Sequence, residues 1–184
     1  PTVADRVVQQ AVVQVIGPAC EARFLPCSFG YRPGRSAQAA VWWVNKAIRD
    51  GDRWVAEFDI VGFFDNLNHQ RLLREVSKVI DDPEVLGLIR RWLRAGVLTD
   101  TGLETRTAGT PQGGVISPLL ANIYLHRRDS EVRPAGFRLI RYADDFVILC
   151  DRRWKAQAAD RLVRHILADI GLQVAEEKSG IVKV

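Results

Sequence analysis

The sequence contains no methionine in its 184 residues and begins at Pro1. Because an unprocessed translation product begins with methionine, we expect the chain to be a piece of a longer polypeptide. Cysteine is scarce as well, and its three residues show no metal-ligand spacing. With no signal peptide or apolar run long enough for a membrane span, this composition predicts reduced thiols in a cytoplasmic protein.

A large excess of one charge is also lacking. Lys and Arg number 26 against 22 Asp and Glu, which leaves a net charge of +4. So small an excess does not identify a nucleic-acid binder, and the local distribution is more informative. Arg90, Arg91 and Arg94 cluster on the helix predicted after Pro83. They either contact phosphates or form an ordinary solvated face, and both interpretations stay open.

Hydrophobic residues make up 47% of the chain, enough for one substantial core. Their spacing predicts helices over residues 5–20, 36–49, 68–80 and 153–170. Two further helices are predicted, one after residue 83 and one that starts at residue 117. Alternation predicts strands over 53–60, 172–174 and 180–184, and hairpins around 99–107 and 138–150. The fold class is therefore α/β (α+β), and we expect one unit whose antiparallel sheet has helices packed on one face.

Two adjacent carboxylates stand at the tip of the later hairpin, in the run Tyr142-Ala143-Asp144-Asp145. The flanks are rich in β-branched and aromatic residues, which favour strands on both sides of a tight turn. Neighbouring carboxylates repel each other, and a divalent cation such as Mg²⁺ or Mn²⁺ removes that cost. Taken alone, the dipeptide is more typical of a solvated turn, because Asp is a common turn residue.

A second acidic strand lies upstream, where apolar residues alternate with Val55, Glu57 and Asp59. If this strand pairs beside the hairpin, Asp59 approaches Asp144 and Asp145. Three carboxylates then surround a site for two metals roughly 3.5–4 Å apart, the spacing used in phosphoryl transfer. Glu57 is the alternative ligand.

Two further segments follow these acids. Beyond Gly62, Phe63 is predicted as a core anchor, and Phe64 either packs in the core or against a sugar ring. The glycine-rich loop at 109–114 permits close backbone approach to a ligand, with Gln112 as donor and acceptor. Ser117 with a following proline marks the start of a helix.

With these motifs in their observed order, the sequence resembles the reverse transcriptases encoded by bacterial group II introns. The resemblance covers nearly the whole chain. The matching blocks are Asp5–Gln10, Ser28–Ser36, Phe58–Ile60, Phe63–Asn66, Gly109–Tyr124, Arg141–Cys150 and Glu177–Ser179. Ser179 stands where threonine is commoner in the family.

The resemblance implies a role for each matching position. Asp59, Asp144 and Asp145 would be the catalytic aspartates, which bind two Mg²⁺ ions, with Mn²⁺ as a possible substitute. Nucleotide contacts are implied at Phe64, Gln112, Ala143 and Lys178. Among these, Phe64 would exclude the ribonucleotide 2′-hydroxyl and Ala143 would lie beside the primer end. Template contacts are implied at Arg32, Arg35 and Ser36.

The resemblance also implies domains and an activity. Residues 1–50 would be part of the fingers and 51–184 the polymerase palm, within one reverse transcriptase domain fragment. The activity would be RNA-directed DNA polymerisation, which joins a dNTP to a DNA or RNA primer on an RNA template. Intron RNA would be a partner of the full-length protein, and no membrane is involved. Two alternatives stay open: an incompetent fragment of an intron-RNA-binding maturase, and a related CRISPR- or defence-associated enzyme.

Overall fold

The computed structural model describes the chain except for residues 96, 100–101, 105–107 and 111–112. Its contacts group the chain into two compact units that alternate along the sequence, where the sequence predicted one. The first comprises Pro1–Phe24 and Gly62–Tyr124, and the second comprises Leu25–Val61 and Leu125–Val184. No helix in the described part of the chain is both long and apolar enough to span a membrane.

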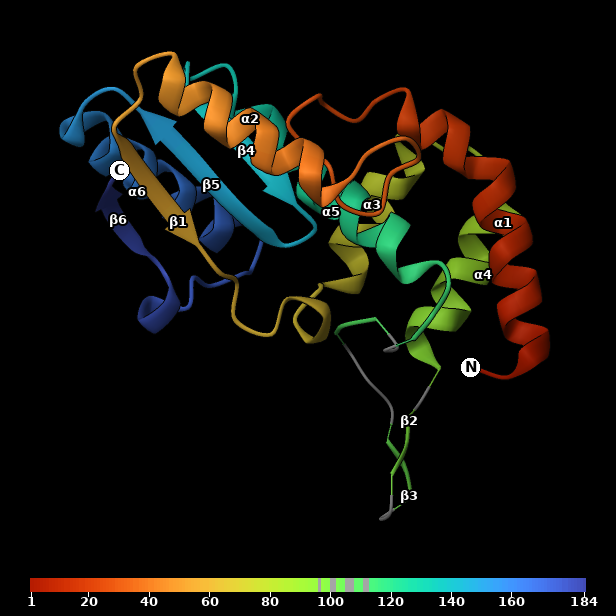
Figure 1. The fold of residues 1–184 in the computed structure, drawn as a ribbon. Helices are drawn as coiled ribbons and strands as arrows, with labels where there is room; N and C mark the ends of the chain where they lie inside the picture. The colour runs from red at the N-terminus through yellow and green to blue at the C-terminus, as the bar shows by residue number, and fades with distance from the viewer. Residues whose placement is uncertain (96, 100–101, 105–107, 111–112) are drawn as a thin grey trace. The chain divides into compact units, whose positions relative to one another are not determined.

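The second unit contains a four-stranded antiparallel sheet with the order β4-β5-β1-β6 (Figure 1). Its strands are β1 (Trp54–Phe58), β4 (Arg138–Tyr142), β5 (Asp145–Cys150) and β6 (Gly180–Lys183), accompanied by helices α2 (Ala37–Arg49) and α6 (Arg153–Asp169) and the 3-10 helix η2 (Glu176–Lys178). The predicted acidic hairpin is therefore confirmed as β4–β5. The strand predicted at 172–174 is wrong, because Val174 forms only an isolated bridge with Ile60.

Helices cover both faces of this sheet, so the expectation of one covered face was wrong. Helix α2 contacts β4 and β5 while α6 contacts β1 and β5, and Figure 1 shows the two helices on opposite sides. The reason lies in the strands, whose successive side chains point to opposite faces. Val55 and Leu149 join a cluster with Ala40 and Ala47 of α2. Ala56, the next residue after Val55, points to the opposite face and is also buried.

The first unit is mainly helical. It holds α1 (Val3–Glu21), the 3-10 helix η1 (Phe63–Asp65), α3 (His69–Ser77), α4 (Pro83–Arg94), the hairpin β2 (Val97–Thr99) and β3 (Gly102–Glu104), and the start of α5 (Ser117–Val132). The predicted cap of α3 is confirmed, because the Asn68 side chain accepts from the Arg71 N–H at 3.0 Å. Asp82 caps α4 in the same way and is followed by proline at the first helical position.

Candidate active site

Asp59 and Asp145 lie side by side at the end of two adjacent strands. The register of β1 and β5 pairs Phe58 with Phe146, and each aspartate is the next residue beyond that pair. Both side chains lie on the same face of the sheet as Val147. On that face, α2 packs against Val55 and Leu149, toward the other end of the two strands. The proximity of these two acids predicted from the sequence is thus found in the structure.

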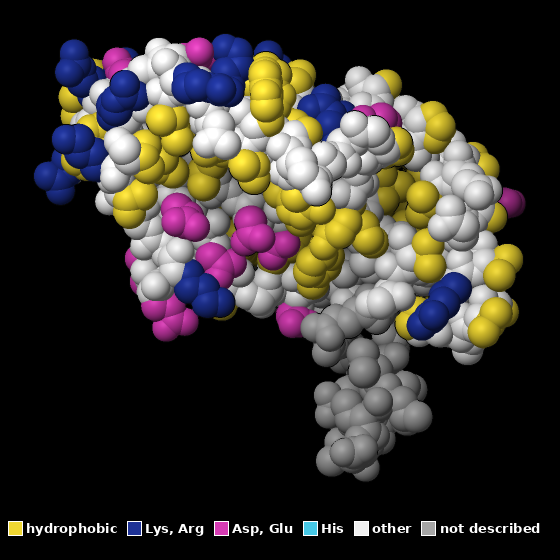
Figure 2. Space-filling view, in the orientation of Figure 1, with side chains coloured by type: hydrophobic (Ala, Val, Ile, Leu, Met, Phe, Trp, Pro, Cys, Tyr) yellow, Lys and Arg dark blue, Asp and Glu magenta, His cyan; other side chains and the backbone are white. Residues whose placement is uncertain are grey.

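The two aspartates line an open pocket of about 440 Å³. Glu57, Val147 and Lys178 line it as well, together with Phe58 and Phe146. Figure 2 shows acidic side chains gathered over this end of β1 and β5. The pocket is therefore a small acidic depression with one lysine at its edge.

The segment that follows α6 makes three contacts with Asp59. The Ala175 N–H donates to the Asp59 carbonyl at 2.8 Å, and the Asp59 N–H donates to the Ser179 hydroxyl at 3.0 Å. Lys178 Nζ lies 3.2 Å from Asp59 Oδ2. The Ser179 hydroxyl thus orients the backbone at Asp59.

Negative charge is in surplus around Asp145. Burial raises the pKa of its carboxyl group, and the charges of Asp144, Asp59 and Glu57 raise the pKa further, against a smaller opposite effect of Lys178. A cation would relieve this repulsion, and carboxylate oxygens are ligands that Mg²⁺ and Mn²⁺ prefer. The donor set therefore suits a divalent cation. Across the described residues, however, no three His, Cys, Asp or Glu side chains are already arranged as a metal site.

The turn that carries Asp144 is held by a hydrogen bond from Arg141 and by close packing against Gly30. Ala143 has a positive φ of 58° and is buried. Arg141 Nη1 donates to its carbonyl at 2.8 Å. Gly30 packs against the turn so closely that a Cβ there would lie 2.2 Å from the Ala143 nitrogen. Ala143 thus packs the turn against Gly30, and its predicted place beside a primer stays a prediction.

Arg141 belongs to a buried ionic cluster that the sequence did not reveal. Its Nη2 lies 2.7 Å from Asp129 Oδ2, Arg128 Nη2 lies 2.8 Å from Asp129 Oδ1, and all three side chains are 0% exposed. Burial alone would raise the pKa of Asp129, but the two guanidiniums outweigh it and hold that pKa below its usual value. Arg128 also lies over the Phe146 ring, 3.7 Å from its centroid. The cluster thus joins α5 to both strands of the acidic hairpin.

Tyr31 is a further neighbour of the acidic turn to which the sequence assigned no role. Its φ of 58° is unusual for a residue with a side chain. Burial raises the pKa of its phenol, and so do Asp144, Tyr142 and Asp145 in that order. Half of the surface of Tyr31 is exposed to solvent. The signal in the sequence was its place directly after Gly30.

The three predicted template residues make local contacts in this structure. Arg32 is buried, and its Nη1 donates to the carbonyls of Leu25 and Ser28 at 2.7 and 2.8 Å. Arg35 Nη1 donates to a backbone carbonyl of the same loop. Ser36 is the N-cap of α2. Arg32 is thus a support of its loop, and template contact by these residues stays a prediction.

Phe64 and the glycine-rich loop belong to the first unit. Phe63 is buried, as predicted for a core anchor, and Phe64 is half-buried with its ring edge-on to Phe63 at 5.1 Å. The Thr110 N–H donates to the Phe64 carbonyl at 2.8 Å. Gly109 has a φ of 86°, and a Cβ there would lie 2.8 Å from the Asp65 carbonyl oxygen. Gln112 lies outside the described residues.

The site thus consists of one aspartate directly after β1, a second at the start of β5 and a third in the adjoining turn, on a four-stranded antiparallel sheet. The chain belongs to the reverse transcriptase (RNA-dependent DNA polymerase) family, whose model matches residues 1–184. The resemblance noted in the sequence is confirmed by this match.

Two curated relatives show which branch of the family the chain is similar to. It is 40% identical over 132 residues to the group II intron-encoded protein LtrA of Lactococcus lactis subsp. cremoris, a match that covers 72% of this chain and 22% of the relative. It is 39% identical over 134 residues to protein YkfC of Escherichia coli (strain K12), covering 70% and 35% of the two chains. The chain thus spans about a fifth to a third of these relatives.

Two solved structures are similar to this chain, the first in fold alone and the second also in sequence. Apo telomerase from Candida tropicalis, truncated from its C-terminal domain, superposes with a TM-score of 0.75 at 15% identity over 95% of this chain and 40% of that one. At this identity the likeness shows the fold alone. A chain of a partial Cas6-RT-Cas1–Cas2 complex is 34% identical, with a TM-score of 0.50 over 92% of this chain and 30% of its own.

Proposed function

We propose that this chain is the polymerase part of a group II intron-type reverse transcriptase. It joins a dNTP to the 3′-hydroxyl of a DNA or RNA primer on an RNA template. The observation that carries the proposal is the pairing of Asp59 with Asp145 in an open pocket where the pKa of Asp145 is raised. The carboxylates of such a site suit a divalent cation, and a bound cation would in turn attract phosphate groups.

The residues of the pocket have separate tasks in this proposal. Asp59 and Asp145 would hold the Mg²⁺ ions, or Mn²⁺ in their place, with Asp144 adding negative charge from the turn. When bound, two such ions activate the primer hydroxyl and neutralise the charge of the phosphates. Lys178 neutralises Asp59 in the free protein. Ser179 keeps the end of β1 in position by accepting from the Asp59 N–H.

Other assignments rest on the family alone. Phe64 selects against ribonucleotides, Gln112 contacts the incoming nucleotide, and residues 1–50 and 51–184 are the fingers and palm portions. RNA template and primer are the partners, together with intron RNA in the longer protein. The three cysteines are free, and burial raises the pKa of each thiol to about 11, which makes them unreactive at neutral pH. The cytoplasmic location rests on the cysteine usage of the sequence.

Two alternatives have their own support. The similarity to a chain of the Cas6-RT-Cas1–Cas2 complex favours a related enzyme of a CRISPR locus. The similarity to a group II intron-encoded protein is equally compatible with a portion that binds intron RNA without catalysis. Genomic neighbours would separate the first alternative from an intron enzyme, and an activity assay separates the second.

The test is primer extension on an RNA template with dNTPs and Mg²⁺. It compares the 184-residue chain with a version that carries the flanking regions found in its relatives. We expect extension by the longer form and its loss in Asp145→Asn. Asp151→Asn, which removes a solvent-exposed acid paired with Lys155, is the matched control and should extend normally. Equal extension by both variants would refute the proposed active site.

A further inference from the structure

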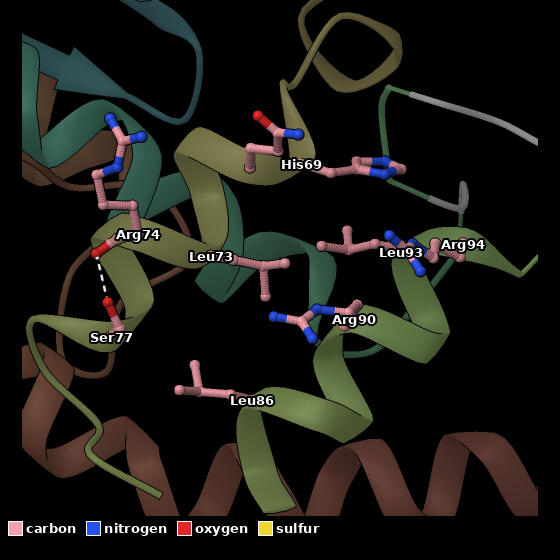
Figure 3. Close-up of a pocket in the computed structure, with 9 residues that line it drawn as sticks. His69, Leu73, Arg74, Ser77, Leu86, Arg90, Leu93 and Arg94 are labelled. Atoms are coloured by element: carbon pink, nitrogen blue, oxygen red, sulfur yellow. Dashed lines mark hydrogen bonds between the residues drawn. The ribbon is translucent and has the colours of Figure 1, made fainter. Parts of the chain in front are cut away.

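A second pocket lies between α3 and α4 in the first unit and shares no residue with the acidic pocket. Its volume is about 470 Å³ (Figure 3). Three arginines, one histidine and three leucines line it, together with Gln70 and Ser77. We call it the α3–α4 groove. Its lining contains no carboxylate among the described residues, which is the reverse of the acidic pocket.

The arginines of this groove carry uncompensated charge. Arg74, Arg90 and Arg94 are exposed, and within the described part of the chain none of them has an ion pair. By contrast, Arg127 pairs with Glu131 and Asp169. Positive charge that a protein gathers without neutralising it is available to an anionic ligand.

The side chains are arranged along the groove. Figure 3 shows Arg90 reaching from α4 toward Leu73 of α3, and His69 beside Arg94 at one end, while Arg74 points away from the centre. His69 Nε2 lies 2.6 Å from the Gly109 carbonyl oxygen. Since a carbonyl only accepts, Nε2 carries the proton and the ring is held in place. The orientation of His69 is thus tied to the start of the glycine-rich loop.

The spacing of the cations suits a repeating anion. Arg90 and Arg94 are four residues apart on α4, so they share one helix face about 6 Å apart along the axis. Leu73 and Leu86 form a partly exposed apolar floor between the helices. Phosphates can bind the guanidiniums while the apolar edge of a sugar or base contacts the leucines. A positively charged groove that follows the backbone is a common feature of proteins that bind single strands without sequence preference.

We propose that the α3–α4 groove binds the phosphodiester backbone of a single nucleic-acid strand, as a site additional to the acidic pocket. An acidic peptide is the competing ligand. Nucleic acid is favoured because the groove combines separated cations with an apolar floor, and because the chain belongs to a family that acts on nucleic acid. The proposal concerns binding alone and does not require the acidic pocket to be catalytic.

The test measures binding of labelled oligouridine and oligothymidine to the chain in EDTA, without dNTPs, over a series of salt concentrations. For single strands the slope of log K against log salt changes by about 0.7 per phosphate contact. We expect Arg90→Gln to reduce the slope by about 0.7 and Arg90→Gln with Arg94→Gln to reduce it by about 1.4. Arg91→Gln removes the same charge from the same helix outside the groove lining and should leave the slope unchanged.

A second measurement uses the unsubstituted chain, so that it does not depend on how the variants fold. Oligouridine should protect Arg90 and Arg94, but not Arg91, from an arginine-selective reagent read by peptide mass spectrometry. Equal protection of all three, or unchanged slopes in folded variants, would overturn the proposal. The proposal would also be overturned if the double substitution abolished the binding of polyglutamate and left the binding of the oligonucleotides unchanged. Because no catalysis is measured, inactivity in primer extension leaves this result unaffected.

Discussion

The ammonium of Lys178 lies 3.2 Å from Oδ2 of Asp59, so this predicted metal ligand already has a cation beside it. The lysine side chain is 67% exposed. Ion pairs of this kind contribute about 0–1 kcal/mol, and a divalent cation can displace them. The contact therefore places an ammonium group beside Asp59 in the free protein without closing the pocket.

From this contact we predict that Lys178→Met tightens Mn²⁺ binding, because the metal no longer competes with an ammonium group. Titration followed by electron paramagnetic resonance measures the free Mn²⁺ directly. Lys183→Met removes a basic residue from β6 outside the pocket and is the control. An affinity that is unchanged or lower in Lys178→Met would contradict the prediction.

Metal affinity should also depend on pH through Asp145. Its raised pKa means that the folded protein holds this proton above the ordinary value of about 3.9. The stabilisation from that proton is therefore complete below the ordinary pKa and is lost as pH rises through the folded value. Since a cation must displace the proton, Mn²⁺ affinity should rise with pH across the same interval. Calorimetric titrations at several pH values check this, and a pH dependence that persists in Asp145→Asn would assign the proton elsewhere.

Asp129 should matter for stability far more than an exposed acid. Its removal in Asp129→Ala leaves Arg128 and Arg141 buried without their carboxylate, which typically costs about 3–5 kcal/mol. Urea unfolding measures the loss. Asp169→Ala removes the exposed partner of Arg127 and should cost less than about 1 kcal/mol. Similar losses in the two variants would show that the buried cluster is not a main support of the fold.

Gly30→Ala should displace the acidic turn. The new methyl group would meet the Ala143 backbone at 2.2 Å, and overpacking of this kind costs about 1–3 kcal/mol. Gly87→Ala in α4 meets nothing nearer than 3.9 Å and should stabilise the protein by up to about 1 kcal/mol. Thermal unfolding compares the two, and primer extension should fall in Gly30→Ala alone.

Phe64→Val tests the predicted sugar gate. Loss of the ring should open space for a 2′-hydroxyl and increase ribonucleotide incorporation, whereas Phe64→Tyr keeps a ring and should retain discrimination. Competition between dNTP and NTP in primer extension, in the form of the protein that extends, is the measurement. Unchanged selectivity in Phe64→Val would remove the gate from the proposal.

Much of the local structure was predictable because its causes lie within a few residues. The cap at Asn68, the turn at Ala143-Asp144 and the alternation that ends at Asp59 each depend on neighbours in the chain. The pairing of β1 with β5 was only a hypothesis in the sequence. The position of Gln112 lies outside the described residues, and the roles of Phe64 and Ala143 remain predictions from the family.

The sequence by itself determined which segments form strands and helices and where acidic residues follow a strand, because periodicity and capping act over short distances. Only the tertiary structure decided that Arg128, Asp129 and Arg141 are buried together, that Gly30 packs on Ala143, and that Lys178 reaches Asp59. These contacts join segments far apart in the chain. A charged residue on a helix or strand has the same local pattern whether it faces water or a buried partner, so its environment exists only once the sheet and its helices are packed.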